Sequence, residues 1–156
     1  MTGPHAVQLG HGFASIICGK AVYMRNAEKN VLVVEDEKLL NWSLASSLAK
    51  WGFSVRPVFT GGDAVAQLDN SAFDIILLDY RLPDLDGIAL ARMARKKQPN
   101  AVIFLLTAFQ LNELALDAGL IDVYFNKPLD LQQLRQALVK APRRLDAKEL
   151  EAQRTS

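Results

Sequence analysis

Carboxylates, a hydroxyl and an ammonium occur where apolar runs of this chain end. These groups belong to Glu35, Asp36, Asp79, Thr107 and Lys127. They are hard oxygen ligands and a point charge with no Cys or His nearby, so the set suits Mg²⁺. The chemistry that it would serve is phosphoryl transfer onto a carboxylate, with Asp79 attacking while Lys127 and Thr107 contact phosphoryl oxygens. Three crowded carboxylates should also raise one another's pKa values unless a cation lies between them.

Asp79 follows the stretch around which the rest of the chain is organised. The continuous apolar run Ile75–Leu78 indicates a strand that is buried on both faces. Tyr80–Asp86 contains a proline and several charged residues and predicts a loop, after which a helix begins at Gly87. Taken alone, Asp79 is better explained as a turn or helix-capping residue. The four companion groups favour a chemical role instead.

The elements that must position these groups alternate between strand and helix. Strands are predicted at Val31–Val34, Phe53–Phe59, Asp74–Leu78, Ala101–Leu106 and Val123–Phe125. Helices are predicted at Glu37–Trp51, Asp63–Leu68, Gly87–Lys97, Phe109–Ala118 and Asp130–Lys140. This alternation predicts a doubly wound α/β fold, with a parallel sheet covered by helices on both faces. The carboxyl ends of parallel strands meet at one edge, which would bring the five groups together.

Helical spacing also predicts which residues of the first and last helices face the core. They are Leu40, Leu44, Ser47, Leu48 and Trp51 in the first helix, and Leu131, Leu134, Leu138 and Val139 in the last. Gly52 is expected to end the first helix in a left-handed conformation. Trp42 lies off the apolar stripe. It is interpreted either as partly buried against a neighbouring helix, which we favour slightly, or as a docking residue for a partner.

Bulk properties describe an ordinary single domain. The chain has 156 residues, a net charge of +1 and one cysteine, so no intrachain disulfide can form. No apolar run approaches the ~20 residues that span a bilayer, and the low net charge does not favour nucleic acid or an anionic membrane. We expect residues 1–29 to be a leader that is disordered or foreign to the natural protein, with Met24 as an alternative start. The folded domain is expected at 30–140, and a charged tail or linker at 141–156.

Four motifs, VLVVED, LLDYRLPDLDG, LLTA and YFNKP, occur in this order within Asn30–Val139. Together they resemble the receiver domain of bacterial response regulators, nearest to the nitrogen-regulatory type, in which a tryptophan falls where Trp42 does. The resemblance implies a flavodoxin-like, five-stranded parallel sheet of order 2-1-3-4-5. It also implies a phosphoprotein of two-component signalling or a phosphorelay. Such a domain is a cytoplasmic switch rather than a turnover enzyme.

The resemblance assigns a role to each motif residue. Asp79 would accept a phosphoryl group from a histidine kinase or a histidine phosphotransfer protein, with Lys127 and Thr107 contacting that group. The Mg²⁺ ligands would be Asp36, Asp79 and the backbone carbonyl of Arg81, and Glu35 would assist through water. Thr107 and Tyr124 would form the switch that reports phosphorylation. The peptide bond between Lys127 and Pro128 is expected to be cis.

The resemblance leaves the output and the oligomeric state open. A homodimer is one candidate assembly, whereas direct contact of this domain with nucleic acid or a membrane is not expected. One alternative is a degenerate receiver that acts only as an interaction module. Another is a dehalogenase-type phosphatase, which needs a second aspartate at the position that Arg81 occupies, and arginine cannot give up its proton.

Two departures from the family pattern lead to further predictions. The interval from Thr107 to Lys127 is about two residues shorter than we expect for the family, which predicts an irregular or mobile helix at Phe109–Ala118. Arg81 and Phe109 lie two residues after Asp79 and Thr107 and would flank the path of an attacking water. Because a long cation and an aromatic ring can exclude water, we expect slow self-dephosphorylation.

Overall fold

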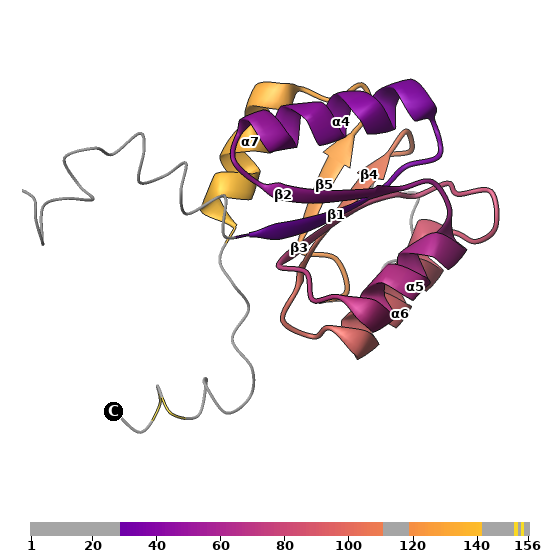
Figure 1. Ribbon diagram of the computed structural model, residues 1–156, viewed down its shortest axis with the longest axis vertical. Helices are drawn as coiled ribbons and strands as arrows, with labels where there is room; N and C mark the ends of the chain where they lie inside the picture. Colours follow the sequence, from indigo (N-terminus) through magenta and orange to yellow (C-terminus); the bar gives the residue numbers. More distant parts are fainter. Residues whose placement is uncertain (1–28, 111–118, 142–151, 153, 155–156) are drawn as a thin grey trace, which may run out of the picture.

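The computed structural model describes residues 29–110, 119–141, 152 and 154. Five parallel strands form one sheet in the order β2-β1-β3-β4-β5 (Figure 1). The strands are β1 (Asn30–Val34), β2 (Ser54–Val58), β3 (Ile75–Asp79), β4 (Val102–Thr107) and β5 (Val123–Asn126). The helices are α4 (Lys38–Lys50), α5 (Gly61–Asn70), α6 (Gly87–Lys97) and α7 (Leu131–Lys140). The predicted doubly wound fold and its strand order are confirmed.

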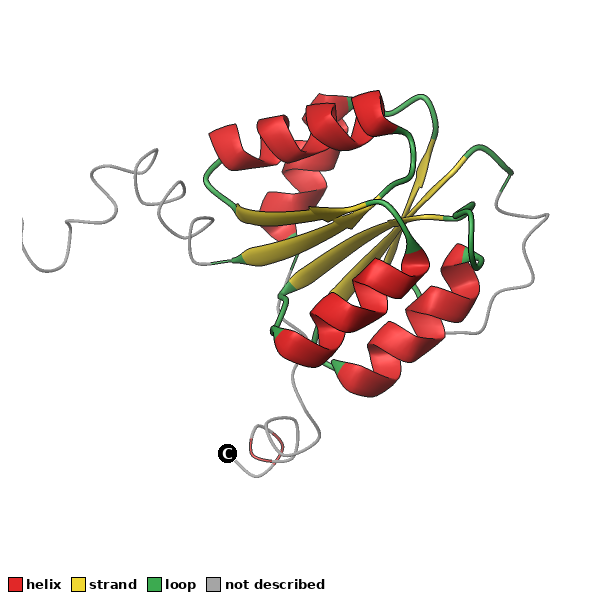
Figure 2. Ribbon diagram, turned by 45° about the vertical axis from the view of Figure 1, so that its right-hand side comes forward, coloured by secondary structure: helices red, strands yellow, loops and turns green. Residues whose placement is uncertain are grey.

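Helices cover both faces of the sheet, α4 and α7 on one and α5 and α6 on the other (Figure 2). Alternate residues of each strand point to opposite faces. Val31 and Val33 therefore pack towards α4 and α7, while Leu32 and Val34 pack towards α5 and α6. The three central strands, β1, β3 and β4, read as apolar runs because both of their faces are buried.

Local sequence signals explain where the helices begin and end. Three helices begin at side chains that accept hydrogen bonds from backbone N–H groups of the first turn: Thr60 for α5, Asp86 for α6 and Asp130 for α7. Gly52 follows α4 with a φ of 95°, the left-handed conformation expected of it. Helix α5 is longer at both ends than the predicted Asp63–Leu68: Thr60 caps it from further upstream, and it continues to Asn70.

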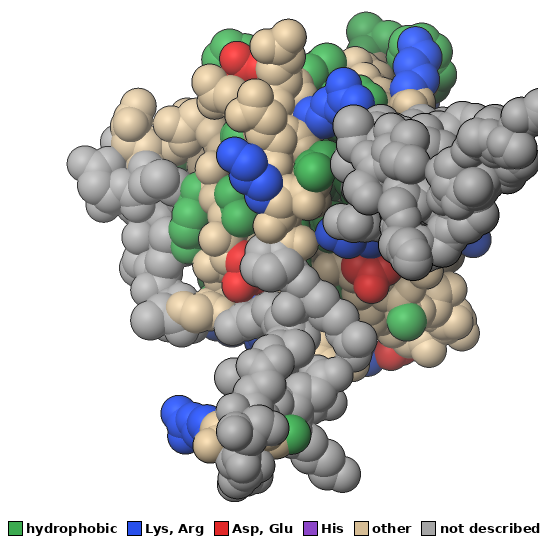
Figure 3. Space-filling view, turned by 90° about the vertical axis from the view of Figure 1, so that its left-hand side faces the viewer, with side chains coloured by type: hydrophobic (Ala, Val, Ile, Leu, Met, Phe, Trp, Pro, Cys, Tyr) green, Lys and Arg blue, Asp and Glu red, His purple; other side chains and the backbone are tan. Residues whose placement is uncertain are grey.

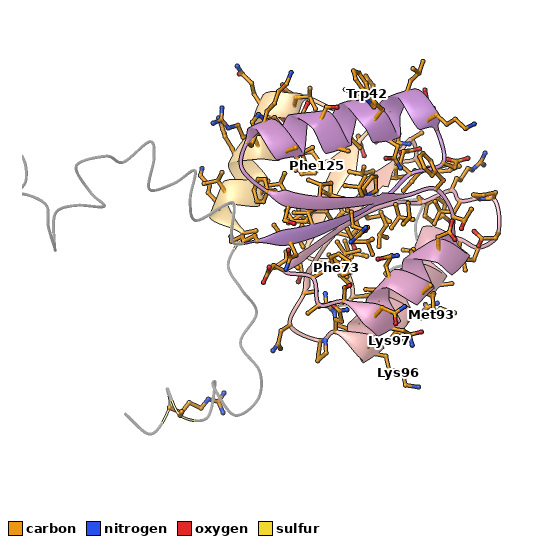
Figure 4. All side chains as sticks on the ribbon, viewed as in Figure 1. Trp42, Phe73, Met93, Lys96, Lys97 and Phe125 are labelled. Carbon is orange, nitrogen blue, oxygen red and sulfur yellow. The ribbon has the colours of Figure 1, made fainter. Side chains whose placement is uncertain are left out.

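Several predictions of side-chain burial are wrong. Leu131 and Val139 are each 37% exposed rather than turned into the core, and Trp42 is 70% exposed, so its predicted partial burial does not hold. Figure 4 shows Trp42 on the outer side of α4, pointing away from the sheet.

Phe109 and Gln110 are not helical. The rest of the predicted helix at Phe109–Ala118 lies outside the described residues, as do residues 1–28 and nearly all of the tail.

The strand register brings the carboxyl ends of three strands into line. Asp79 is the partner of Leu106 across β3 and β4, and Thr107 is the partner of Asn126 across β4 and β5. The groups that follow these strands therefore meet at the carboxyl edge of the sheet. Among the described residues, no helix has both the length and the apolar character needed to cross a membrane.

Candidate functional site

Three carboxylates gather at the carboxyl edge of the sheet. One oxygen from each of Glu35, Asp36 and Asp79 lies within 4.8 Å of the other two. Glu35 and Asp36 follow β1, and Asp79 is the last residue of β3, its neighbour in the sheet. Glu35 and Asp79 are buried while Asp36 is exposed. The structure therefore places two acids at the base of the site and one at its mouth.

Lys127 supplies the positive charge of the site. Its Nζ atom lies 2.8 Å from Oε2 of Glu35 and 3.1 Å from Oδ1 of Asp79. The second oxygen of Glu35 accepts a hydrogen bond of 3.1 Å from the backbone N–H of Glu37. Both oxygens of Glu35 are thus bonded within the protein, whereas Asp36 is open to solvent. The lysine directly follows β5, and its bond to Pro128 is cis, as expected.

Burial sets the protonation behaviour of this cluster. Desolvation raises the pKa of the Glu35 and Asp79 carboxyls, and the hydrogen bonds and charge of Lys127 oppose that increase. Repulsion between the acids also raises both pKa values, but by less than burial does. The predicted direction is correct, although mutual repulsion was the expected cause. Desolvation lowers the pKa of Lys127, but its bonds to Glu35 and Asp79 outweigh that effect, and the net pKa is raised.

The residues that follow β3 and β4 pack together beside the acids. The Thr107 side chain is fully buried, and its hydroxyl accepts a hydrogen bond of 2.9 Å from the N–H of Phe109. The guanidinium carbon of Arg81 lies 4.7 Å from the centre of the Phe109 ring, and Tyr80 meets the same ring edge-on at 5.5 Å. Arg81 and Phe109, which sequence reasoning paired only by position, are therefore in contact.

Tyr124 lies on β5, the edge strand next to Thr107. Its ring is partly buried against the core on the α5 and α6 side of the sheet. Burial, followed by the negative charge of Asp122, raises the pKa of its hydroxyl. The structure thus places Tyr124 on the strand beside Thr107, in an inward position.

Sequence reasoning missed two polar residues that join segments at the carboxyl edge of the sheet. Asn41 is 1% exposed and donates hydrogen bonds to two backbone carbonyls at the ends of β1 and β2. Asp84, in the loop after β3, accepts bonds of 2.8 and 2.7 Å from the N–H groups of Gly61 and Gly62 at the start of α5. Asn41 lies at helical spacing from Leu44 and Leu48, so a polar residue on an apolar stripe would have revealed it.

The donor set fits a hard divalent cation. Three carboxylates against one ammonium leave an excess of negative charge in a site that is mostly buried, and a cation relieves that excess. Every candidate ligand is an oxygen, which suits Mg²⁺. Asp36 and Asp79 are the better direct ligands, because both oxygens of Glu35 already have partners.

Comparison with known proteins supports this picture. The family model of the response regulator receiver domain matches residues 31–139. The transcriptional regulatory protein ZraR of Salmonella typhimurium is 36% identical over 115 residues, which cover 72% of this chain and 26% of ZraR. The DNA-binding transcriptional regulator NtrC of Proteus hauseri is 28% identical over 72% of this chain and 24% of its own length. The chain therefore spans about a quarter of the length of these relatives.

A solved structure has a similar fold. The response regulator TrrA of Thermotoga maritima, crystallised in complex with Mg²⁺ and BeF, superimposes with a TM-score of 0.66 at 28% identity, covering 72% of this chain and 97% of TrrA. The match to NtrC confirms the expected likeness to receivers of the nitrogen-regulatory type. With its family model matched over most of its length, its sheet in the expected order and its acids gathered around one lysine, this chain belongs to the response regulator receiver domains of two-component systems.

Proposed function

We propose that Asp79 is the phosphoacceptor of a signalling switch. The observation that carries the proposal is the Lys127 ammonium, which bridges Asp79 and Glu35 beside the exposed carboxylate of Asp36. The donor is the phosphohistidine of a histidine kinase or a phosphotransfer protein. An oxygen of Asp79 bonds to phosphorus as the bond to the imidazole nitrogen breaks, and the electron pair of that bond returns to the ring. The product is an acyl phosphate.

The residues around Asp79 divide the work of this transfer. Lys127 holds one carboxylate oxygen in place and offers its charge to the phosphoryl oxygens. Asp36, Asp79 and the backbone carbonyl of Arg81 would hold Mg²⁺, which would supply further neutralisation of charge when bound. Glu35 positions Lys127 and orders water. The Asp79 carboxylate is already oriented by its hydrogen bond from the backbone of Arg81.

The switch runs from Thr107 to Tyr124. The Thr107 hydroxyl accepts a hydrogen bond from the N–H of Phe109, and a phosphoryl group on Asp79 would offer a charged acceptor to the O–H of Thr107. Movement of Thr107 would change the packing beside it, where the half-buried Tyr124 lies on the neighbouring strand. A covalent charge thereby biases a two-state element, which is how one modification controls an output. The domain acts in the cytoplasm, and a change in this face would alter its contacts with an output domain or a second copy.

The donor approaches over α4. Leu39 and Trp42 are 78% and 70% exposed and lie one helical turn apart. Beside them is a surface hollow of about 560 Å³ lined by Glu37, Leu39, Leu40, Lys127, Pro128 and Leu129. Exposed apolar side chains rimmed by polar groups mark contact surfaces. Because this surface adjoins Lys127, a helix seated on it would bring a histidine to Asp79.

The test uses acetyl phosphate and Mg²⁺ with the full chain, followed by measurement of the intact mass. We expect one added phosphoryl group on the wild-type protein and none on Asp79→Ala. Asp84→Ala, which alters an acid of the same loop outside the cluster, should still be modified. Absence of the adduct from the wild type would favour a degenerate receiver. Continuous release of phosphate would favour the phosphatase alternative.

A further inference from the structure

Asn41 joins three parts of the chain at the base of the site. Its carboxamide nitrogen Nδ2 donates a bond of 2.8 Å to the carbonyl of Glu35 and another of 2.8 Å to the carbonyl of Val58. The side chain is 1% exposed, so these bonds are made away from water. A carboxamide has two N–H donors on one nitrogen and carries no charge. Both donors are used here, one at the end of β1 and one at the end of β2.

These bonds fix the backbone of Glu35 on both sides. The N–H of Glu35 donates to the carbonyl of Val58 at 3.2 Å, and its own carbonyl accepts from Asn41. A residue with both peptide groups held has little freedom in where its side chain leaves the chain. The Glu35 carboxylate then bonds to Lys127, which in turn contacts Asp79. A continuous series of bonds therefore runs from Asn41 to the phosphoacceptor.

We propose that Asn41 is a positioning residue for the Mg²⁺ and phosphoryl chemistry of this site, an inference that rests on the proposed function. It acts through the Glu35 backbone, which sets the direction of the Glu35 side chain. The same backbone also fixes the position of the peptide bond to the next residue, Asp36. Residues that orient the groups of a metal site from outside its ligand shell typically change metal affinity 10–100-fold when they are lost. A merely structural role for Asn41 would lower stability without this change in affinity.

The experiment compares Asn41→Ala and Asn41→Leu with Leu48→Ala in the full chain. Leu48 is fully buried on the same helix and packs in the core on the α4 and α7 side, so its loss matches the lost packing. Asn41→Leu keeps the branching and the number of heavy side-chain atoms but removes both donors. Asn41→Ala leaves room for water to bond to the two carbonyls, so it can fold even where the leucine variant does not. The Mg²⁺ dissociation constant is measured by calorimetry on protein shown to be folded by circular dichroism.

We expect Mg²⁺ binding at least about tenfold weaker in the Asn41 variants and close to the wild-type value in Leu48→Ala. Equal affinities in Asn41→Ala and Leu48→Ala would overturn the positioning role, whether both are normal or both are reduced. Failure of the wild-type protein to bind Mg²⁺ would instead overturn the proposed function. The two failures therefore give different results.

Discussion

The two edges of the sheet use their polar groups in opposite ways. At the amino edge, Gln98 bonds to Leu68, Ser71 and Phe73, and Arg95 bonds to Pro99, Ala101, Leu120 and Asp122. These bonds go mostly to backbone groups and join segments that are distant in sequence. At the carboxyl edge, three carboxylates share one lysine.

The polar groups of the amino edge therefore hold the fold together, whereas those of the carboxyl edge are arranged to bind a ligand. Figure 3 views the molecule from the side where β1 begins, and acidic, basic and apolar side chains are interspersed there. The carboxyl edge instead keeps an excess of negative charge, and there desolvation, followed by repulsion between the acids, raises the pKa of both Glu35 and Asp79. Burying unbalanced charge costs stability. The fold tolerates that cost at the edge where a cation and a phosphoryl group would bind.

The largest expected effect is at the amino edge, on stability alone. Arg95→Leu removes bonds to three backbone carbonyls and to Asp122, so we expect the free energy of unfolding to fall by about 3 kcal/mol. Phosphorylation of the folded variant by acetyl phosphate should be unchanged. Lys96→Leu, on the exposed side of the same helix, should change stability by less than about 0.5 kcal/mol. Denaturant unfolding measures the stability, and the intact mass measures the phosphorylation. Slower phosphorylation of Arg95→Leu would contradict the idea that the two edges act independently.

A smaller effect is expected at the carboxyl edge, on the lifetime of the acyl phosphate. Arg81 and Phe109 pack on each other beside Asp79 and would shield its phosphoryl group from water. Replacing both, as Arg81→Asn with Phe109→Glu, should speed hydrolysis about tenfold, or 1.4 kcal/mol in the barrier. Decay of the phosphorylated mass after removal of the donor gives the rate. Met93→Glu, an exposed position on α6, serves as the control, and an unchanged rate in the double variant would refute the shielding.

The smallest expected effect is a gain in stability from removing the charge of Asp79. Because burial raises the pKa of Asp79, the folded protein binds its proton more tightly than the unfolded chain does. Stability therefore falls as the pH rises from the unfolded pKa through the folded one. Asp79→Asn should remove that loss and raise the free energy of unfolding by roughly 1 kcal/mol at pH 7 without Mg²⁺. Unfolding curves from about pH 4 to 8 test this, and a variant less stable across the range would contradict it.

The charge of Asp84, on the same edge, has the opposite effect on how stability depends on pH. Hydrogen bonds from the N–H groups of Gly61 and Gly62 lower the pKa of its carboxyl. Its contribution to stability is therefore present above the unfolded pKa and is lost as the pH falls towards the folded pKa. Asp84→Asn should lower stability at pH 7, which makes it the matched control for Asp79→Asn.

The sequence predicted the sheet and the proximity of Glu35, Asp36 and Asp79 to Lys127, because continuous apolar runs that end in polar residues can be recognised without a structure. It did not reveal that Asp84 holds the start of α5, since that bond depends on two loops meeting in the folded chain. Helical spacing placed Leu131 inward because an apolar stripe is wider than the surface that α7 buries. The inward position of Asn41 could have been predicted from its helical spacing, but a polar residue is not usually expected on a buried face.

A hydrogen bond between Lys29 and Ala141 affects how the domain can be joined to others. The Lys29 ammonium donates to the carbonyl of Ala141 at 3.2 Å, which ties the entrance of β1 to the exit of α7. Polypeptide attached before the first or after the second of these residues starts from the edge opposite Asp79. A domain joined to either end would thus leave the carboxyl edge of the sheet open, where we propose that the phosphodonor binds.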